Sequence, residues 1–111
     1  MSNLQEEKLV PVVIDLSVNQ DQINESWLRQ FGAGVELLLK NMFGLNNLNF
    51  TMRGPKSSVV QFAKTLKKEK KYIDALKKAG LMDVESITRK SDLVRSIEKF
   101  EKLTGIKWPL K

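Results

Sequence analysis

The apolar positions of this chain change their spacing along its length, and the change predicts strands alternating with helices. Over residues 12–18, apolar side chains alternate with Asp15 and Ser17, which is the period of a half-buried strand. The same alternation returns over residues 48–53. We therefore expect a strand in each segment. Pro11 is expected at the start of the first strand or on a sheet edge, because proline cannot donate a hydrogen bond to a neighbouring strand.

A helical period occupies the segment between these strands, from about Asp21 to Phe43. Apolar residues there recur three or four positions apart and form one continuous stripe, made of Ile23, Trp27, Phe31, Val35, Leu38 and Met42. Asn19 or Asp21 is expected to cap the start of this helix, and Gly44 is expected to end it.

Two glycines, Gly32 and Gly34, interrupt this helix in mid-course. Together they cost about 2 kcal/mol of helix stability relative to alanine, so the pattern favours a close approach of another part of the same chain. A bend, a hinge or a phosphate-binding loop is the alternative interpretation, for which a Gly-x-Gly pattern alone is a weak signal.

A further helical stripe begins after the second strand. Its members are Val59, Phe62, Ala63, Leu66, Ile73 and Leu76. A lysine-rich run divides the stripe and predicts a kink or short break near Glu69. We expect this helix to end at Gly80, residues 81–90 to form a loop with a short turn, and Ser91 to cap a last helix that ends at Gly105.

Together these segments predict an α+β fold, a small single domain over residues 1–111 with about two β-strands packed against three main α-helices. Residues 1–8 are expected to form a polar N-terminal arm and residues 106–111 an extended C-terminal tail. Trp108 is costly to expose in such a tail. Either it folds back onto the domain's own core, the alternative we favour, or it anchors the chain in a neighbouring subunit.

The net charge of +6 is unevenly distributed. Residues 1–55 carry four basic and six acidic side chains, or −2, whereas residues 56–111 carry fifteen basic and seven acidic side chains, or +8. A basic half of this kind attracts phosphate backbones, anionic lipids or acidic protein surfaces, and charge alone does not choose among them.

Eight lysines lie between Lys56 and Lys78. We expect them on the outer side of a helix, where they form either a solvated face or a docking surface for phosphate groups. The candidate anion or nucleic-acid contacts are Lys56, Lys64, Lys67, Lys68, Lys71, Tyr72 and Lys78, with the tyrosine available for stacking on a base. At the helix start beside Lys56, we favour capping by a serine over an anion site. Since the chain has only four arginines, we expect any nucleic-acid binding to be non-specific.

The chain contains no histidine and no cysteine. It therefore lacks the imidazole and thiol groups that often act as proton shuttles, nucleophiles and transition-metal ligands, and its carboxylates show no spacing that would gather them into one site. Catalysis by a lysine or a hydroxyl group is the alternative, but no single lysine stands out among so many. We expect a protein that is not an enzyme and uses no metal or cofactor. A missing signal-peptide pattern and the lack of a long apolar run predict no membrane span and a cytoplasmic location.

The helix that ends near Phe43 is apolar over more than one face in its last turns, which predicts a second covering layer or another chain. Together with the C-terminal tail, this helix end supplies the candidate partner contacts Leu38, Leu39, Met42, Phe43, Trp108 and Leu110.

Several short runs follow one another along most of the chain: WLRQFG at 27–32, MFG at 42–44, RG at 53–54, FAK at 62–64, KKYI at 70–73, FE at 100–101 and TGIKWP at 104–109. Their order resembles small uncharacterised virion proteins of tailed bacteriophages. The resemblance implies a structural subunit of the head, neck or tail, assembled in the host cytoplasm, in contact with larger virion proteins and with copies of itself. It implies no catalytic residues. Our first hypothesis is thus a virion assembly or decoration module, and the second a non-specific nucleic-acid-binding protein.

Overall fold

Two strands and three long helices make up the described part of the chain in a computed structural model, which covers residues 10–44 and 48–110. The elements are β2 (Val10–Asp15), a 3-10 turn η1 (Gln20–Gln22), α1 (Glu25–Met42), β3 (Leu48–Arg53), α2 (Lys56–Ala79) and α3 (Val84–Thr104). The predicted α+β class is confirmed. The polar arm expected at residues 1–8 lies outside the described residues.

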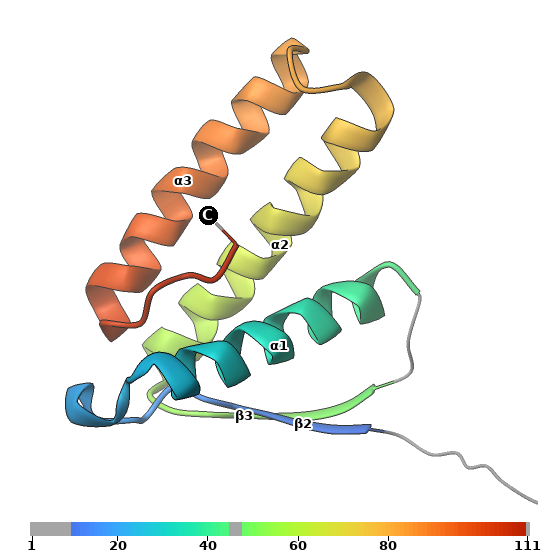
Figure 1. The fold of residues 1–111 in the computed structure, drawn as a ribbon. Helices are drawn as coiled ribbons and strands as arrows, with labels where there is room; N and C mark the ends of the chain where they lie inside the picture. The colour runs from blue at the N-terminus through green and yellow to red at the C-terminus, as the bar shows by residue number, and fades with distance from the viewer. Residues whose placement is uncertain (1–9, 45–47, 111) are drawn as a thin grey trace, which may run out of the picture.

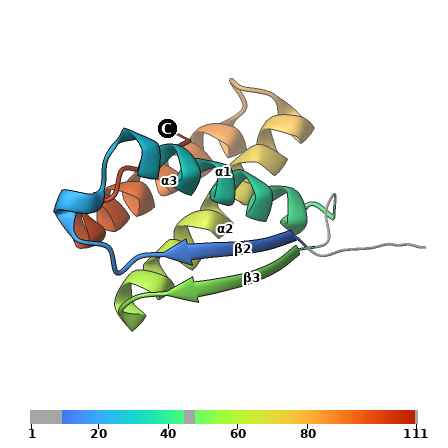
Figure 2. The same ribbon diagram turned by 60° about the horizontal axis from the view of Figure 1, so that its bottom comes forward.

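β2 and β3 pair in parallel, with Val12 opposite Phe50 and Ile14 opposite Met52. Parallel strands need a crossover connection, and α1 supplies it by lying over one face of the sheet (Figures 1 and 2). β2 lies earlier in the chain than the predicted strand at 12–18. It ends at Asp15 because the carboxylate accepts hydrogen bonds from the Ser17 amide at 3.0 Å and from the Ser17 hydroxyl at 2.6 Å, which closes a turn.

α1 begins later than predicted, because neither Asn19 nor Asp21 is its cap. The cap is Asn24, whose Oδ1 accepts a hydrogen bond from the Trp27 amide at 2.9 Å. The residues before it form the 3-10 turn η1.

The glycines in α1 make room for other parts of the same chain, as the pattern favoured. A Cβ on Gly34 would lie 2.9 Å from Ile14 Cδ1 of β2, and a Cβ on Gly32 would lie 3.2 Å from Pro109 Cβ of the C-terminal tail. Both positions are therefore fixed by packing, and the helix runs unbroken through them.

α2 and α3 form an antiparallel hairpin that projects beyond α1 and the sheet (Figure 1). The kink predicted near Glu69 is wrong, because this side chain lies on the buried side of a continuous helix and accepts a hydrogen bond from Trp108 Nε1 at 2.9 Å. The loop predicted for residues 81–90 is also wrong. Asp83 caps α3 by accepting from the Glu85 amide at 2.9 Å, so the helix starts at Val84 and Ser91 lies inside it.

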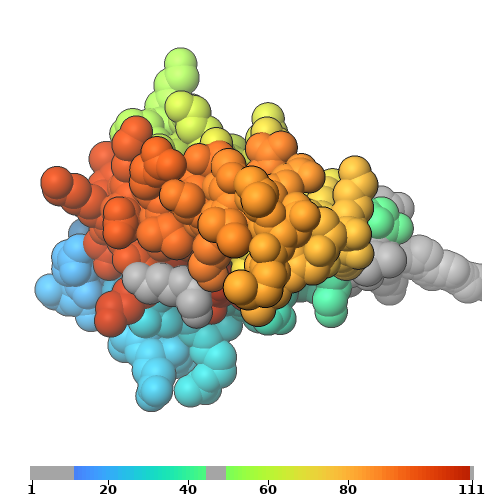
Figure 3. All heavy atoms as spheres, turned by 90° about the horizontal axis from the view of Figure 1, so that it is seen from above, coloured from blue at the N-terminus to red at the C-terminus, as the bar shows by residue number. Residues whose placement is uncertain are grey.

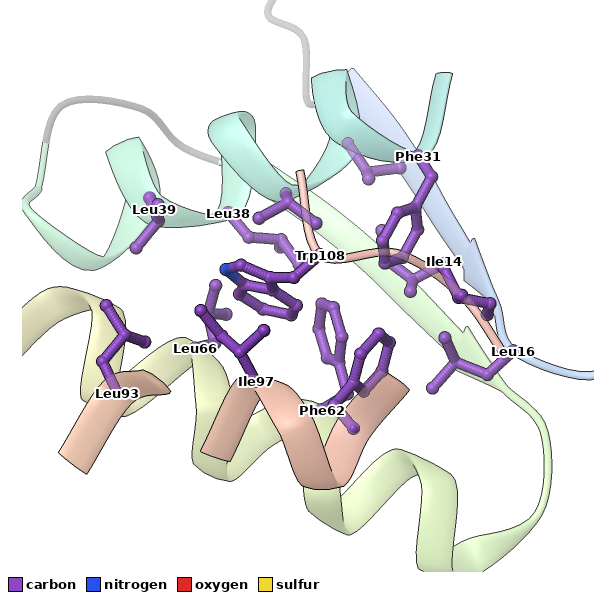
Figure 4. Packing of buried hydrophobic residues seen from close by; sticks show 14 residues of the cluster. Ile14, Leu16, Phe31, Leu38, Leu39, Phe62, Leu66, Leu93, Ile97 and Trp108 are labelled. Atoms are coloured by element: carbon purple, nitrogen blue, oxygen red, sulfur yellow. The ribbon is translucent and has the colours of Figure 1, made fainter. Parts of the chain in front are cut away.

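Buried residues from both strands, the helices and the tail meet in one core. Figure 4 shows Trp108 among them, close to Phe62 and Ile97. The indole ring lies 5.7 Å from the Phe62 ring and 5.3 Å from the Phe100 ring, measured between centroids, in tilted and edge-on geometries that aromatic pairs prefer. With 2% of its surface exposed, Trp108 belongs to the core of its own chain, and its alternative role as an anchor in a neighbouring subunit is wrong.

Candidate functional site

A basic groove runs along one side of the hairpin, between α2 and α3. One part of it is a hollow of about 490 Å³, lined by Gln61, Lys64, Lys68, Asp92, Arg95, Ser96 and Lys99. Four of these side chains are cationic and one is acidic, a net charge of +3 for the lining. We call this feature, together with its continuation towards the hairpin turn, the basic groove.

Helix periodicity places the cations in two facing rows. Lys64 and Lys68 are one turn apart on α2, as are Arg95 and Lys99 on α3, so each pair lies on one side of its helix. The groove continues into a second hollow of about 180 Å³, lined by Lys71, Asp74, Ala75, Lys78, Glu85 and Arg89. At about 1.5 Å of rise per residue, the lysines on the α2 side extend over roughly 21 Å.

The carboxylates of the groove are already matched with cations. Asp92 lies 3.5 Å from Arg95 Nη2, Glu85 lies 3.7 Å from Arg89 Nη2, and Asp74 lies 2.9 Å from Lys70 Nζ. Within the described ranges, no ion pair of 4.0 Å or less involves the ammonium groups that remain, which belong to Lys64, Lys68, Lys71, Lys78 and Lys99. Positive charge is thus in excess along the whole groove.

A hydrogen-bond network forms the floor and fixes the distance between the two helices. Gln61 Nε2 donates to the Ser96 carbonyl at 3.2 Å and to the Ser96 hydroxyl at 3.1 Å, and the hydroxyls of Thr65 and Ser96 lie 2.8 Å apart. Thr65 and Ser96 are both buried. The small side chains let the helices approach closely, and the mutual bonds make the floor rigid.

This arrangement can bind anions through its excess of positive charge. Among residues 10–44 and 48–110, no group of three or more acidic side chains is placed to hold a metal ion. The groove therefore offers charge and shape as its means of recognition.

The structure brings together Lys64, Lys68, Lys71 and Lys78 from the predicted lysine set and adds Arg95 and Lys99. Sequence reasoning missed these two because it did not predict which helices face each other; their spacing of four on one helix was the available signal. The candidate contacts Lys56 and Lys67 are exposed on α2 outside the basic groove. Pro55 precedes α2 and no side-chain bond caps the helix, so the predicted serine cap is wrong.

Tyr72 is not placed to stack on a base held in the groove. It lines a different hollow together with Lys90, whose Nζ lies 5.0 Å from the centre of the tyrosine ring. Lys90 and Lys99 are two and a half turns apart at about 3.6 residues per turn, so this hollow and the basic groove border opposite sides of α3.

The candidate partner contacts are mostly covered by their own chain. Leu38 and Leu39 are 3% and 7% exposed, because α2 and the tail cover this side of their helix (Figure 4). The prediction that these two leucines contact a partner is therefore wrong. Met42 and Phe43 are half-buried, and the Phe43 ring lies beneath the ammonium groups of Lys70 and Lys77, at 4.8 Å and 4.4 Å from its centre. Leu110 is half-buried against the core.

Comparisons with protein-family models, curated proteins and solved structures found no match to this chain. Within the part of the chain that the structure describes, none of the helices has the length and apolar character needed to cross a membrane.

Proposed function

We propose that this protein is a non-enzymatic binding module whose basic groove holds the phosphate backbone of a nucleic acid. The observation that carries the proposal is the pair of facing cation rows, in which Lys64 and Lys68 lie opposite Arg95 and Lys99. Among the described residues, three of these four side chains have no carboxylate within ion-pair distance. Polyanions bind such surfaces by displacing counterions, without any need for a specific sequence.

The chemistry of the lining favours phosphate contacts over base contacts. Lysines act as point charges, whereas base edges are read chiefly by bidentate arginine, asparagine or glutamine side chains. The amide of Gln61 already donates to Ser96. The two arginines that line the groove, Arg89 and Arg95, lie within ion-pair distance of Glu85 and Asp92. Among the described residues that line the groove, none is aromatic. Affinity is therefore expected to come from charge alone and to fall steeply with salt.

A role in a tailed-phage particle is a second proposal, which rests on the sequence runs described above. In that setting, the basic groove would hold the genome or an acidic surface of a larger virion protein. It is favoured by large apolar side chains left uncovered at the hairpin turn, of which Met82 is 82% exposed, since such side chains are typical of contact surfaces.

The first proposal is tested by measuring the affinity for a fluorescent random-sequence DNA duplex over a series of salt concentrations. For B-DNA the slope of log K against log salt is about −0.9 per neutralised phosphate, so Lys64→Gln/Lys68→Gln should make it shallower by about 2 units and weaken binding at every salt concentration. The matched control is Lys40→Gln/Lys107→Gln, which removes the same charge from exposed positions outside the groove.

Two results would overturn the proposal. Absence of binding at low salt would mean that the groove does not serve nucleic acid. Equal losses in both double variants would mean that net charge, rather than the groove, attracts the DNA.

A further inference from the structure

The turn of the α2–α3 hairpin exposes four large apolar side chains. Leu81, Met82, Val84 and Ile87 are 67%, 82%, 77% and 54% exposed. They lie at the end of the hairpin farthest from the sheet (Figure 1), the end that faces the viewer in Figure 3, where yellow and orange atoms lie in front. We call residues 81–87 the apolar tip.

An apolar hollow of about 190 Å³ lies away from this turn, where the C-terminal end of α1 meets β3 and α2. Its walls are almost entirely apolar and are formed by Leu38, Met42, Phe50, Met52, Phe62 and Leu66. Phe50, one of the lining residues, is 46% exposed. Ala63, Asn41 and Lys67 complete the lining of this feature, which we call the apolar socket.

The tip and the socket match in size. A dry apolar cavity of about 150 Å³ is large enough to hold a benzene molecule, so the socket has room for one large aliphatic side chain such as that of Met82. Methionine also adapts its shape to irregular apolar hollows and packs well against aromatic rings such as Phe50 and Phe62.

Their charges are complementary as well. The tip carries Asp83 and Glu85 and no basic residue, on a chain whose net charge is +6. Because Glu85 pairs with Arg89 Nη2 at 3.7 Å, Asp83 provides the excess negative charge of the tip. The socket is bordered by Lys67, which has no carboxylate within ion-pair distance among the described residues. An isologous contact of tip with tip would instead bring the acidic side chains of two copies together, at a cost in electrostatic energy.

We propose that the apolar tip of one copy of this protein inserts into the apolar socket of a second copy. The proposal does not depend on nucleic-acid binding, because neither surface includes a cation of the basic groove; the tip shares only Glu85 with the lining of that groove. The two surfaces differ, so the contact is heterologous, and each added copy presents one free tip and one free socket. Association therefore continues into a ring or a filament.

The test is a light-scattering mass measurement over a concentration series, without nucleic acid. The wild-type protein should grow beyond a dimer. Leu81→Ser/Met82→Ser should stay monomeric, because it removes the two apolar side chains at the turn, including the methionine that fits the socket. Ala63→Trp should also stay monomeric, because Ala63 is exposed at the rim and a larger side chain there fills the socket without replacing a core residue.

Mixing the two variants makes the test decisive. The tip of Ala63→Trp still fits the intact socket of Leu81→Ser/Met82→Ser, but neither copy can add another, so a mixture should stop at a one-to-one dimer. Leu103→Ser is the matched control, because Leu103 is 50% exposed at the opposite end of α3 and its loss should leave association unchanged. Thermal melts check that every variant is folded.

Three outcomes would overturn the proposal. A wild-type protein that stays monomeric at all concentrations shows that the tip does not bind a second copy. Growth of Ala63→Trp like the wild type shows that the tip binds elsewhere. A mixture of folded variants that stays monomeric shows that tip and socket are not partners.

Discussion

The two ends of the α2–α3 hairpin contain similar apolar side chains, which are buried at one end and exposed at the other. At the base, Phe62 and Phe100 are 1% and 0% exposed, with Trp108 packed against both. At the turn, Leu81 and Met82 are 67% and 82% exposed. The base is covered by α1, the sheet and the C-terminal tail, whereas no described element covers the turn (Figure 1). The helices are therefore formed at both ends, but their apolar side chains are buried only at the base, where α1, the sheet and the C-terminal tail cover them.

The largest expected effect separates these two ends directly. Trp108→Ala should lower the free energy of unfolding by about 3–5 kcal/mol, because it opens a cavity beside Phe62 and Phe100 and leaves the buried Glu69 carboxylate without its donor. Leu81→Ala/Met82→Ala should change it by less than about 0.5 kcal/mol per site, as surface substitutions do. Urea denaturation measures both, at protein concentrations low enough to keep the chain monomeric. Comparable losses at the two ends would show that the turn is covered in solution.

A smaller effect is expected midway along the hairpin, where polar groups replace the apolar core. Thr65→Val should cost about 1.5 kcal/mol, because it removes the 2.8 Å hydrogen bond to the buried Ser96 hydroxyl, which keeps its bond from Gln61 Nε2 at 3.1 Å. Adding Ser96→Ala should cost less than the sum of the two single losses, since both partners are then apolar. A double-mutant cycle measured in urea gives the coupling. Strict additivity would show that the two hydroxyls do not interact.

The base of the hairpin was more predictable from sequence than its turn, for a physical reason. Apolar stripes such as Val59, Phe62 and Leu66 arise where one side of a helix is buried. They predicted α2 correctly because the core covers this part of the helix. Val84 and Ile87 are helical but uncovered, so no stripe revealed them, and only the cap at Asp83 marked the start of α3.

The candidate site was half predictable for the same reason. Lys64 and Lys68 belong to a dense run that is visible in the sequence, whereas Arg95 and Lys99 gain their role from the pairing of α2 with α3. That pairing depends on long-range packing, which includes the bond between Trp108 and Glu69. No local pattern encodes it.

The cap at the turn provides the next prediction, with an expected cost of about 1 kcal/mol. Asp83→Ala removes the oxygen that accepts from the Glu85 amide at 2.9 Å, and the loss of a side-chain cap typically costs about that much. Asp83→Asn keeps an oxygen acceptor and should retain most of the stability. Chemical denaturation gives the difference, and amide hydrogen exchange should locate it in the first turn of α3. Equal stability of Asp83→Ala and the wild type would mean that α3 does not need this cap.

The smallest expected effect concerns the buried carboxylate at the base. Burial raises the pKa of Glu69 above its ordinary value of 4.5, with the Trp108 hydrogen bond and the charge of Lys90 opposing the shift. A carboxyl group with a raised pKa in the folded state stabilises the fold most at pH values below 4.5, and this contribution is lost as the pH rises through the raised pKa. Relative to Glu69→Gln, the wild-type protein should therefore gain stability as the pH falls from neutral towards 4.5. Thermal melts of both proteins over this pH range measure the gain, and Glu98→Gln at an exposed position is the control. A stability difference that did not vary with pH would mean that Glu69 ionises as readily in the folded protein as in the unfolded chain.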